Sequence, residues 1–362
     1  MGNSKRDSNR HETTSQEVKS KIERQLWIGK KFLIEAKGTG KNKFSAEKDA
    51  EKKFTVKLKE HLNTGILNHS LLPDNLSLAV SKYIPVVFSE KMDNGPENNK
   101  YEIIDKKIFL ESLSNLSYKK NKTIESITHL EGFENVLSEE FSSSSRLICG
   151  LGSGSVLETS ITLDHTRGVP YIPGSSLKGI CRSVAYARLV QDKKISFDKL
   201  EEFEEKFYGE LDVDDKDILT WQLLFGAQNF KSLLLFIDAY PVKDGQLELD
   251  IMNNHYAEYY QDKKAPGDWE NPVPIFFLTV KENTAFKFNV FFDNWRWEKI
   301  KNEGLKIKKG KEEILLNIDH KAVEGKVKKE NFIKEIIKEA LENYGVGSKR
   351  NVGYGMFKIQ NN

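Results

Sequence analysis

The most constraining feature of this sequence is the alternation of short apolar strands with amphipathic helices, without a regular βαβ rhythm. Continuous apolar runs at 233–239 and 275–280 are typical of buried strands, and residues 285–292 alternate as a strand does. Helical spacing of apolar residues marks 175–189 and 331–344. Together these patterns predict an α+β fold.

The remaining elements are predicted from weaker patterns. We expect a less regular segment up to Glu140 and an alternating strand at 156–163. Further helices are predicted at 16–28, 44–61, 106–116, 197–207 and 217–224, with strands at 31–35 and 356–360.

The chain has 362 residues, a length that fits two domains or one domain with insertions. We expect residues 1–72 to form a basic N-terminal extension, partly disordered and partly helical. Residues 73–362 should form the α+β body, with a lysine-rich insertion near 299–330. Residues 1–60 carry 16 Lys and Arg against 9 Asp and Glu, whereas the whole chain has a net charge of only +2. Such a basic arm often binds nucleic acid, although a solubilising lysine face is the alternative.

Composition excludes several classes of protein. Hydrophobic residues make up 38% of the chain, which permits a sizeable core. No apolar run approaches the ~18 residues of a membrane span, and the first residues lack the apolar stretch of a signal peptide. Cys149 and Cys181 alone cannot form a disulfide framework or a zinc site. We therefore expect a soluble cytoplasmic protein with no membrane partner, no metal and no cofactor.

The first informative motif spans 168–182 and contains a Pro-Gly turn before a helix. Ser175 or Ser176 can cap that helix, whose first N–H groups then suit an anionic oxygen such as a phosphate. Lys178 and Arg182 are four residues apart and should share one helix face. The alternative is an ordinary capped helix packed into the core.

The second motif is a glycine-rich loop at 345–355, with four glycines in eleven residues. Gly347 and Gly353 let the backbone approach another chain closely, and Lys349 and Arg350 stand at the centre. Such a loop can follow a phosphate backbone, although a lysine-bearing turn is the plainer interpretation. It is not a dinucleotide fingerprint, because an arginine stands where a glycine is required.

Enzyme motifs are incomplete. Residues 175–178 match S-x-x-K, but neither K-T-G nor S-D-N occurs in the chain. Gly40 and Lys41 are followed by an asparagine, so a P-loop is absent. His165 and His255 could serve acid–base or metal roles, and hydrogen bonding or RNA contact is the preferred interpretation for both.

The two motifs, Pro170–Gly179 and Gly347–Gly355, together resemble the RAMP superfamily of CRISPR effector subunits. Further stretches are similar to the family of sixth subunits of type III-B (Cmr) complexes, in the right order over roughly 75–360. They are Asn75–Pro85, Gly154–His165, Leu224–Ala227, Asp250–Tyr260 and the closing glycine loop.

This resemblance implies a ferredoxin-like (RRM-type) core with helical and loop insertions that binds CRISPR RNA (crRNA). It implies a non-catalytic subunit near the crRNA 3′ end, with target-RNA cleavage assigned to a different subunit. Its implied partners are the crRNA, other RAMP subunits and the small helical subunit of the Cmr complex, with target RNA contacted indirectly.

The residues expected to bind RNA come from both motifs and from the 154–165 stretch. They are His165, Ser175, Ser176, Lys178, Arg182, Gly347, Lys349, Arg350 and Gly353. No residue is expected to be catalytic or to bind a metal. Two alternatives stay open: a metal-independent RAMP-type endoribonuclease that processes CRISPR transcripts through His165 or His255, and the equivalent end subunit of a type III-A complex.

Overall fold

The computed structural model divides the chain into two compact units, each described separately below. The N-terminal unit comprises Met1–Leu71 and Tyr83–Asp105, and the main unit comprises Leu72–Lys82 and Lys106–Asn362. The residues that the structure describes are 20–28, 31–40, 49, 53, 75–82, 86–91, 100–103, 106–114, 116–119, 129–155, 157–254, 256, 259–261, 263–265, 267, 272–309, 312–328 and 332–358.

The N-terminal unit contains a four-stranded antiparallel sheet in the order β2-β1-β3-β4. Its strands are β1 (Ser20–Ile28), β2 (Lys31–Gly40), β3 (Val86–Lys91) and β4 (Lys100–Ile103). The domain boundary expected at residue 72 stays a prediction. The structure adds that β3 pairs with β1, so β3 and β4 share a sheet with the two N-terminal strands.

The helix predicted at 16–28 is wrong over the residues described there, because Ser20–Ile28 form β1. Ile22 and Leu26 are four residues apart, a spacing that fits a helix face and equally one face of a strand. Pairing with β2 on one side and β3 on the other gives the backbone of β1 its hydrogen-bond partners. The strand predicted at 31–35 is confirmed and extends to Gly40. Of the helix predicted at 44–61, the described residues are Asp49 and Lys53, which are helical.

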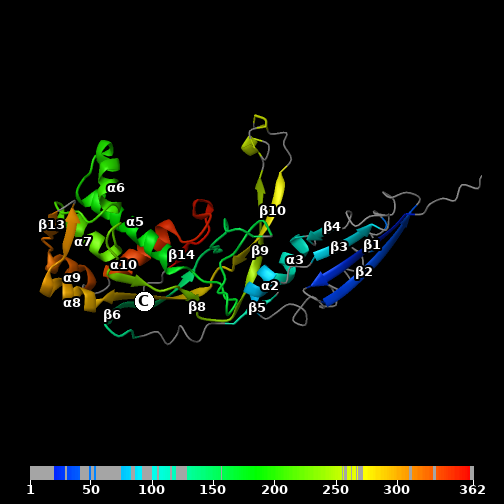
Figure 1. Cartoon of the computed structure of the whole chain (residues 1–362), viewed down its shortest axis with the longest axis horizontal. Coiled ribbons are helices and arrows are strands. Elements are labelled where there is room, and N and C mark those ends of the chain that lie inside the picture. Colours follow the sequence, from blue (N-terminus) through cyan, green and yellow to red (C-terminus); the bar gives the residue numbers. More distant parts are fainter. Residues whose placement is uncertain are drawn as a thin grey trace, which may run out of the picture. The chain divides into compact units, whose positions relative to one another are not determined.

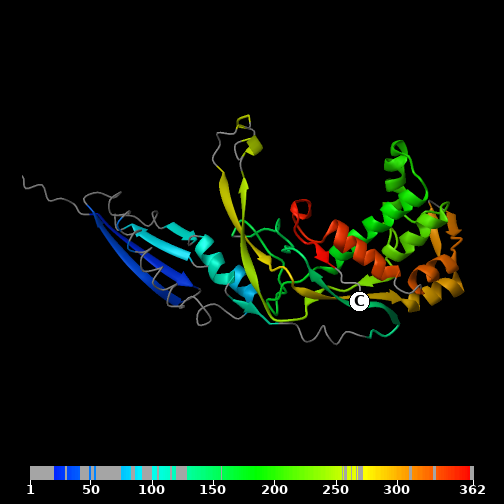
Figure 2. The same ribbon diagram turned by 180° about the vertical axis from the view of Figure 1, so that it is seen from behind.

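The main unit is built on an antiparallel sheet in the order β14-β6-β11-β7. Its strands are β6 (Phe133–Ser143), β7 (Leu234–Phe236), β11 (Ala285–Asp293) and β14 (Phe357–Lys358), and β8 (Tyr240–Pro241) also pairs with β11. Helices α5 (Gly174–Asp192) and α10 (Phe332–Glu339) lie on the same side of this sheet (Figures 1 and 2). A π-helical turn, η4 (Ala340–Tyr344), continues α10.

A second sheet of the main unit has the order β10-β9-β5. Strands β9 (Gly245–Asn254) and β10 (Val273–Val280) form a hairpin that projects from the body (Figure 1), and β5 is Ser117–Tyr118. The other elements of the unit are helical apart from one small hairpin. They are α2 (Leu76–Lys82), α3 (Lys106–Ser114), η2 (Phe197–Lys199), α6 (Leu200–Tyr208), α7 (Lys216–Phe225), η3 (Tyr259–Gln261), α8 (Asn294–Glu303), β12 (Lys306–Lys309), β13 (Glu312–Leu315), α9 (His320–Lys328) and η5 (Arg350–Val352).

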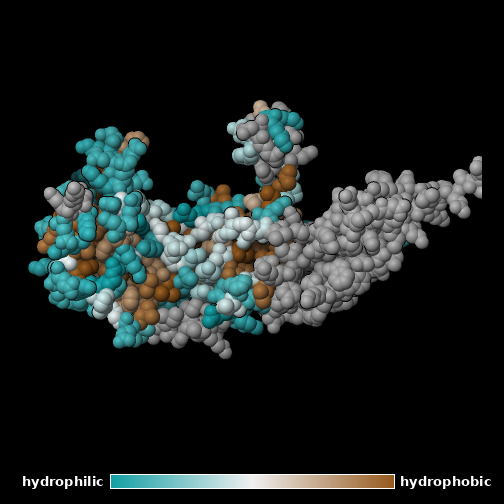
Figure 3. All heavy atoms as spheres, viewed as in Figure 1, coloured by the Kyte–Doolittle hydropathy of each residue, from teal (hydrophilic) through white to brown (hydrophobic). Residues whose placement is uncertain are grey.

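The core lies between the first sheet and its helices. Phe288 of β11 is fully buried and its ring contacts Phe141 of β6 and Phe357 of β14. Leu177 of α5 and Ile336 of α10 are fully buried as well. By contrast, the surface over α6 is mostly hydrophilic (Figure 3). No helix among the described residues has both the length and the apolar character of a membrane span.

Two further predictions need correction. The segment up to Glu140 was expected to be less regular, but its residues from Phe133 onward form β6, whose buried Leu137 and Phe141 are four residues apart and conceal the strand period. The strand predicted at 156–163 is wrong: of its described residues, only Leu163 makes a β-bridge, and Glu158 has a φ of 70°. A positive φ is incompatible with an extended strand, so the apolar residues that alternate in this part of the sequence belong to a loop.

Candidate RNA-binding site

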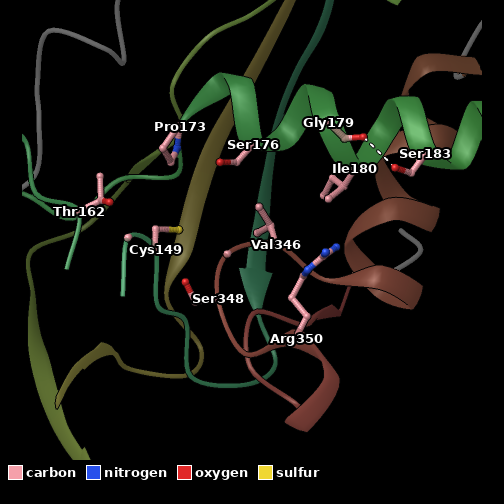
Figure 4. A pocket seen from close by; sticks show the side chains of 12 residues that line it. Cys149, Thr162, Pro173, Ser176, Gly179, Ile180, Ser183, Val346, Ser348 and Arg350 are labelled. Atoms are coloured by element: carbon pink, nitrogen blue, oxygen red, sulfur yellow. Dashed lines mark hydrogen bonds between the residues drawn. The ribbon is translucent and has the colours of Figure 1, made fainter. Parts of the chain in front are cut away.

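A cavity of about 580 Å³ opens between α5 and the glycine loop, which we define as residues 345–355. Figure 4 shows Ser176 and Ile180 on the α5 side, and Val346 and Arg350 on the loop side. The described residues that line it are Cys149, Gly150, Thr162, Pro173, Ser176, Gly179, Ile180, Ser183, Val346, Gly347, Ser348 and Arg350. Both motifs singled out in the sequence therefore contribute to one cavity.

The start of α5 is capped from outside the helix. The serine cap expected at Ser175 or Ser176 is wrong, because the helix begins at Gly174 and its N-cap, Pro173, makes no side-chain cap hydrogen bond. Instead the Gly174 N–H donates to Oδ1 of Asp238 at 2.7 Å. A phosphate at this point would meet the Asp238 carboxylate, so the helix N-terminus is poorly suited to a second anion.

Close backbone packing fixes the glycine loop. Gly347 has a φ of 93°, and a Cβ there would lie 2.3 Å from the carbonyl oxygen of Ile148. The neighbouring Ser348 N–H donates to that same oxygen at 2.7 Å. The loop also closes on itself, because the Val346 N–H donates to the Gly355 carbonyl at 2.9 Å. Glycine at 347 is thus required both by conformation and by space.

The two cations of the loop have different surroundings. Arg350 is exposed, begins η5 and lines the cavity. Lys349 has a left-handed φ of 59°, and its Nζ lies 5.9 Å from the ring centroid of Phe277 in β10. Gly353, with a φ of 92°, is exposed and faces open space. Arg350 is therefore the cation of this loop that reaches the cavity.

Lys178 and Arg182 share one face of α5 as predicted, but that face does not line the cavity. At 100° per residue they lie roughly 200° and 240° around the helix from Ser176. Lys178 Nζ donates to Ser232 Oγ at 2.8 Å, and burial, followed by repulsion from Arg182 and Lys231, lowers the pKa of Lys178. Lys178 and Arg182 therefore lie outside the cavity that Arg350 lines.

Arg182 is committed to protein contacts on that second face. Its Nη2 donates to the Phe207 carbonyl at 3.1 Å, and its guanidinium lies 4.5 Å from the ring centroid of Tyr208. Its Nε is buried and has no hydrogen-bond partner among the described residues. Burial lowers the pKa of Arg182. Contacts of this kind support the helical region around α6 rather than a ligand.

His165 lies in an exposed turn and is not among the residues that line the cavity. Asn75 Nδ2 donates to its carbonyl oxygen at 3.2 Å. The adjacent Asp164 accepts hydrogen bonds from Thr166 and from the Tyr240 hydroxyl. Burial acts to raise the pKa of Asp164, but these hydrogen bonds outweigh it, and its pKa is lowered. The turn is thus held by Asp164, and His165 is exposed outside the cavity.

His255 lies outside the described residues. Among the residues that the structure does describe, no group of three His, Cys, Asp or Glu side chains could hold a metal ion. Both cysteines are buried and unbridged, and burial raises the pKa of the Cys149 thiol in the cavity wall to about 12.

A polar network that the motif reasoning missed holds the glycine loop against β9. The Arg146 guanidinium donates to Glu248 at 3.1 and 3.2 Å and to Asp250 Oδ2 at 2.8 Å. Tyr354, near the end of the loop, donates its hydroxyl to the same Asp250 oxygen at 2.6 Å. Burial, together with the hydrogen bond to Asp250, raises the pKa of Tyr354 to about 12. The two-residue spacing of Glu248 and Asp250 places both carboxylates on one face of a strand, which was the available sequence signal.

Besides Ile180, the residues missed on the α5 side are Gly179 and Ser183. They follow Ser176 by three and seven residues, the spacing of one helix face. Ser183 Oγ donates to the Gly179 carbonyl at 3.1 Å (Figure 4). The charged residues that the sequence analysis selected, Lys178 and Arg182, lie on another face of the same helix. The face that lines the cavity carries mostly small residues.

Residues 140–358, which include every residue lining the cavity, match the model of the RAMP superfamily. The chain belongs to the RAMP superfamily. This RAMP protein is homologous to CRISPR system Cmr subunit Cmr6 of Pyrococcus furiosus, with 30% identity over 300 residues, covering 70% of this chain and 78% of that one. A second Cmr6, from Saccharolobus solfataricus, is 27% identical over 139 residues, which cover 38% of each chain.

A chain in the solved structure of a type III-B Cmr-beta complex bound to cognate target RNA is 19% identical, with a TM-score of 0.44 over 71% of each chain. The RAMP match begins at residue 140, so the N-terminal unit lies outside it. The basic residues 1–60 therefore lie outside the part of the sequence that matches the RAMP superfamily.

Proposed function

We propose that this RAMP protein is a crRNA-binding structural subunit of a cytoplasmic type III-B (Cmr) CRISPR effector complex in antiviral defence, located near the crRNA 3′ end. The observation that carries the proposal is the cavity between α5 and the glycine loop. Its wall includes loop backbone, hydroxyl groups and the Arg350 guanidinium beside apolar side chains such as Ile180 and Val346, all within the region that matches the superfamily. Homology to the Cmr6 subunits supports the choice of complex.

The core is proposed to be ferredoxin-like. The chain order β6, α5, β7, β11, α10, β14 follows a βαββαβ pattern once insertions are set aside. Numbered within that pattern, the sheet order β14-β6-β11-β7 becomes 4-1-3-2, with both helices on one side. The helices between α5 and β7, the projecting hairpin and residues 294–328 are then insertions, and the N-terminal unit is an extension.

The RNA is proposed to be held by its sugar–phosphate backbone. Arg350 supplies the cation, and Ser176 and Ser348 supply hydroxyls from opposite walls. Ser175, Lys349 and Gly353 are neighbours of these residues in sequence, and they are proposed to contact the RNA strand on either side of the cavity. Backbone contacts carry no sequence information, which suits a subunit that must accept any spacer. Lys178 and Arg182, held by protein contacts, are assigned to the support of α5.

The subunit is proposed to be non-catalytic. Of the described residues that line the cavity, none is His, Asp, Glu, Lys or Tyr, and the thiol of Cys149 is kept neutral by burial. A general base is therefore missing where the RNA would lie. Incubation of the purified protein with a repeat-containing transcript should leave the transcript intact. Specific cleavage that is lost on His165→Ala would establish the endoribonuclease alternative instead.

The proposed partners are the crRNA, neighbouring RAMP subunits and the small helical subunit, with target RNA contacted indirectly. Affinity purification from the native host, followed by mass spectrometry and RNA sequencing, tests all of them together. Co-purification of type III-B RAMP proteins with a small repeat-tagged RNA is the expected result. Recovery of type III-A subunits would assign the chain to the other complex, and recovery of the protein without RNA would contradict the proposal.

A further inference from the structure

Gly179 is a glycine in the interior of α5 that the folded chain does not itself require. Glycine destabilises a helix interior relative to alanine, so a glycine there needs a reason. A Cβ placed on Gly179 would meet no heavy atom within 4 Å. By contrast, a Cβ on Gly174 of the same helix would lie 2.2 Å from the carbonyl oxygen of Phe236. Packing explains the glycine at 174 and leaves the one at 179 unexplained.

The position of Gly179 in the cavity wall can explain why a glycine stands there. It is exposed, and with Ser176, Ile180 and Ser183 it forms the α5 wall of the cavity. The opposite wall is the glycine loop with Arg350 (Figure 4). An added methyl group at 179 would therefore project into the space that a bound molecule would fill, at the one glycine among the α5 residues that line the cavity.

We propose that Gly179 is the point where the sugar–phosphate backbone of bound RNA approaches α5 most closely, so that the RNA, not the protein, excludes a side chain. This inference rests on the proposed function. The chemistry of the wall favours a backbone over a base, because no lining residue among those described is aromatic and stacking platforms are built from aromatic rings. Hydroxyls and a single guanidinium suit ribose and phosphate instead.

A matched control exists in α9. Gly325 is also exposed in a helix interior, and a Cβ there would likewise meet nothing within 4 Å, but it does not line the cavity. Gly179→Ala and Gly325→Ala should each raise the thermal unfolding temperature of the full-length protein, since alanine stabilises both helices. Only Gly179→Ala should weaken binding of a single-stranded RNA carrying the host CRISPR repeat tag, by about tenfold, or ~1.4 kcal/mol.

Two further measurements sharpen the test. Gly179→Leu should weaken binding more than Gly179→Ala, because leucine fills more of the cavity while remaining a good helix former. Neither variant should change the salt dependence of binding, because no charge is removed. RNA affinity unchanged in Gly179→Ala and Gly179→Leu would overturn the inference, and so would an equal loss in Gly325→Ala. Failure of the wild-type protein to bind the RNA would instead contradict the proposed function itself.

Discussion

The two sides of helix α5 differ in a way that separates structural support from the proposed RNA binding. One side carries Lys178 and Arg182, whose charged groups are occupied by Ser232, the Phe207 carbonyl and the Tyr208 ring. The other side carries small residues, Ser176, Gly179 and Ser183, and opens onto the cavity. The side of α5 with more positive charge is thus the one whose charged groups make contacts within the protein. The proposed phosphate site is the space between the small residues of α5 and the backbone of the glycine loop, and its cation, Arg350, comes from that loop.

The largest effect is expected at the loop wall of the cavity. Gly347→Ala should lower the free energy of unfolding by about 2–3 kcal/mol, because an alanine at positive φ is strained and its Cβ would collide with the Ile148 carbonyl. Gly353→Ala is the matched control, with a similar φ but no neighbour within 4 Å, and should cost only about 1 kcal/mol. Denaturant unfolding measures both. Equal losses would show that collision with Ile148 plays no part.

The next effect concerns the network that holds the loop on β9. Tyr354→Phe removes the hydrogen bond to Asp250 and should lower the free energy of unfolding by about 2 kcal/mol near pH 8. The pKa of Tyr354 rises from 10.0 to about 12 on folding. Between those values the unfolded chain loses the proton first, so the stabilisation is complete below pH 10 and declines as pH rises toward 12.

Unfolding of wild type and Tyr354→Phe at a series of pH values from 8 to 11 checks this sign. The difference between the two proteins should narrow above pH 10. A difference that is constant across the series would mean that the hydroxyl is not bound to the Asp250 carboxylate.

A smaller effect is expected on the supporting side of α5. Arg182→Ala should lower the free energy of unfolding by about 1 kcal/mol, through lost packing on Tyr208 and the lost bond to Phe207, while RNA affinity stays unchanged. Arg182→Leu keeps part of that packing and should lose less. Titration calorimetry with RNA and thermal unfolding of both variants separate the two readouts. Weakened RNA binding at unchanged stability would reverse the roles assigned to the two sides.

Much of the fold could be predicted where one period dominates the sequence. Strand β11 and helices α5 and α10 occupy the segments expected, because their apolar residues recur clearly at two or at 3.6 residues, and β10 does so because its apolar run is continuous. Prediction failed for β1 and β6, where apolar residues four apart satisfy both periods and strand pairing decides. It also failed for 156–163, where a backbone turn interrupts a pattern that alternates in sequence alone.

The candidate site shows the same division. Placing Ser176 and Arg350 in one site required only that two motifs converge, and the structure brings both to one cavity. Helical spacing correctly placed Lys178 and Arg182 on one face of α5. Spacing alone cannot show that this face is covered by other parts of the chain, here Ser232 and Phe207. The cap from Asp238 was beyond prediction for a similar reason, because it comes from 64 residues away.

The most direct test compares Arg350, which lines the cavity, with Lys178, which lies on the side of α5 away from it. The quantity compared is the salt dependence of RNA binding. For Arg350→Ala, the slope of log K against log salt concentration should flatten by about 0.7, the contribution of one phosphate contact on a single strand. For Lys178→Met, which lies on the supporting side, the slope should match that of the wild type, whatever the spacer sequence. An unchanged slope for Arg350→Ala together with a flattened slope for Lys178→Met would contradict the assignment of the cavity as the RNA-binding side.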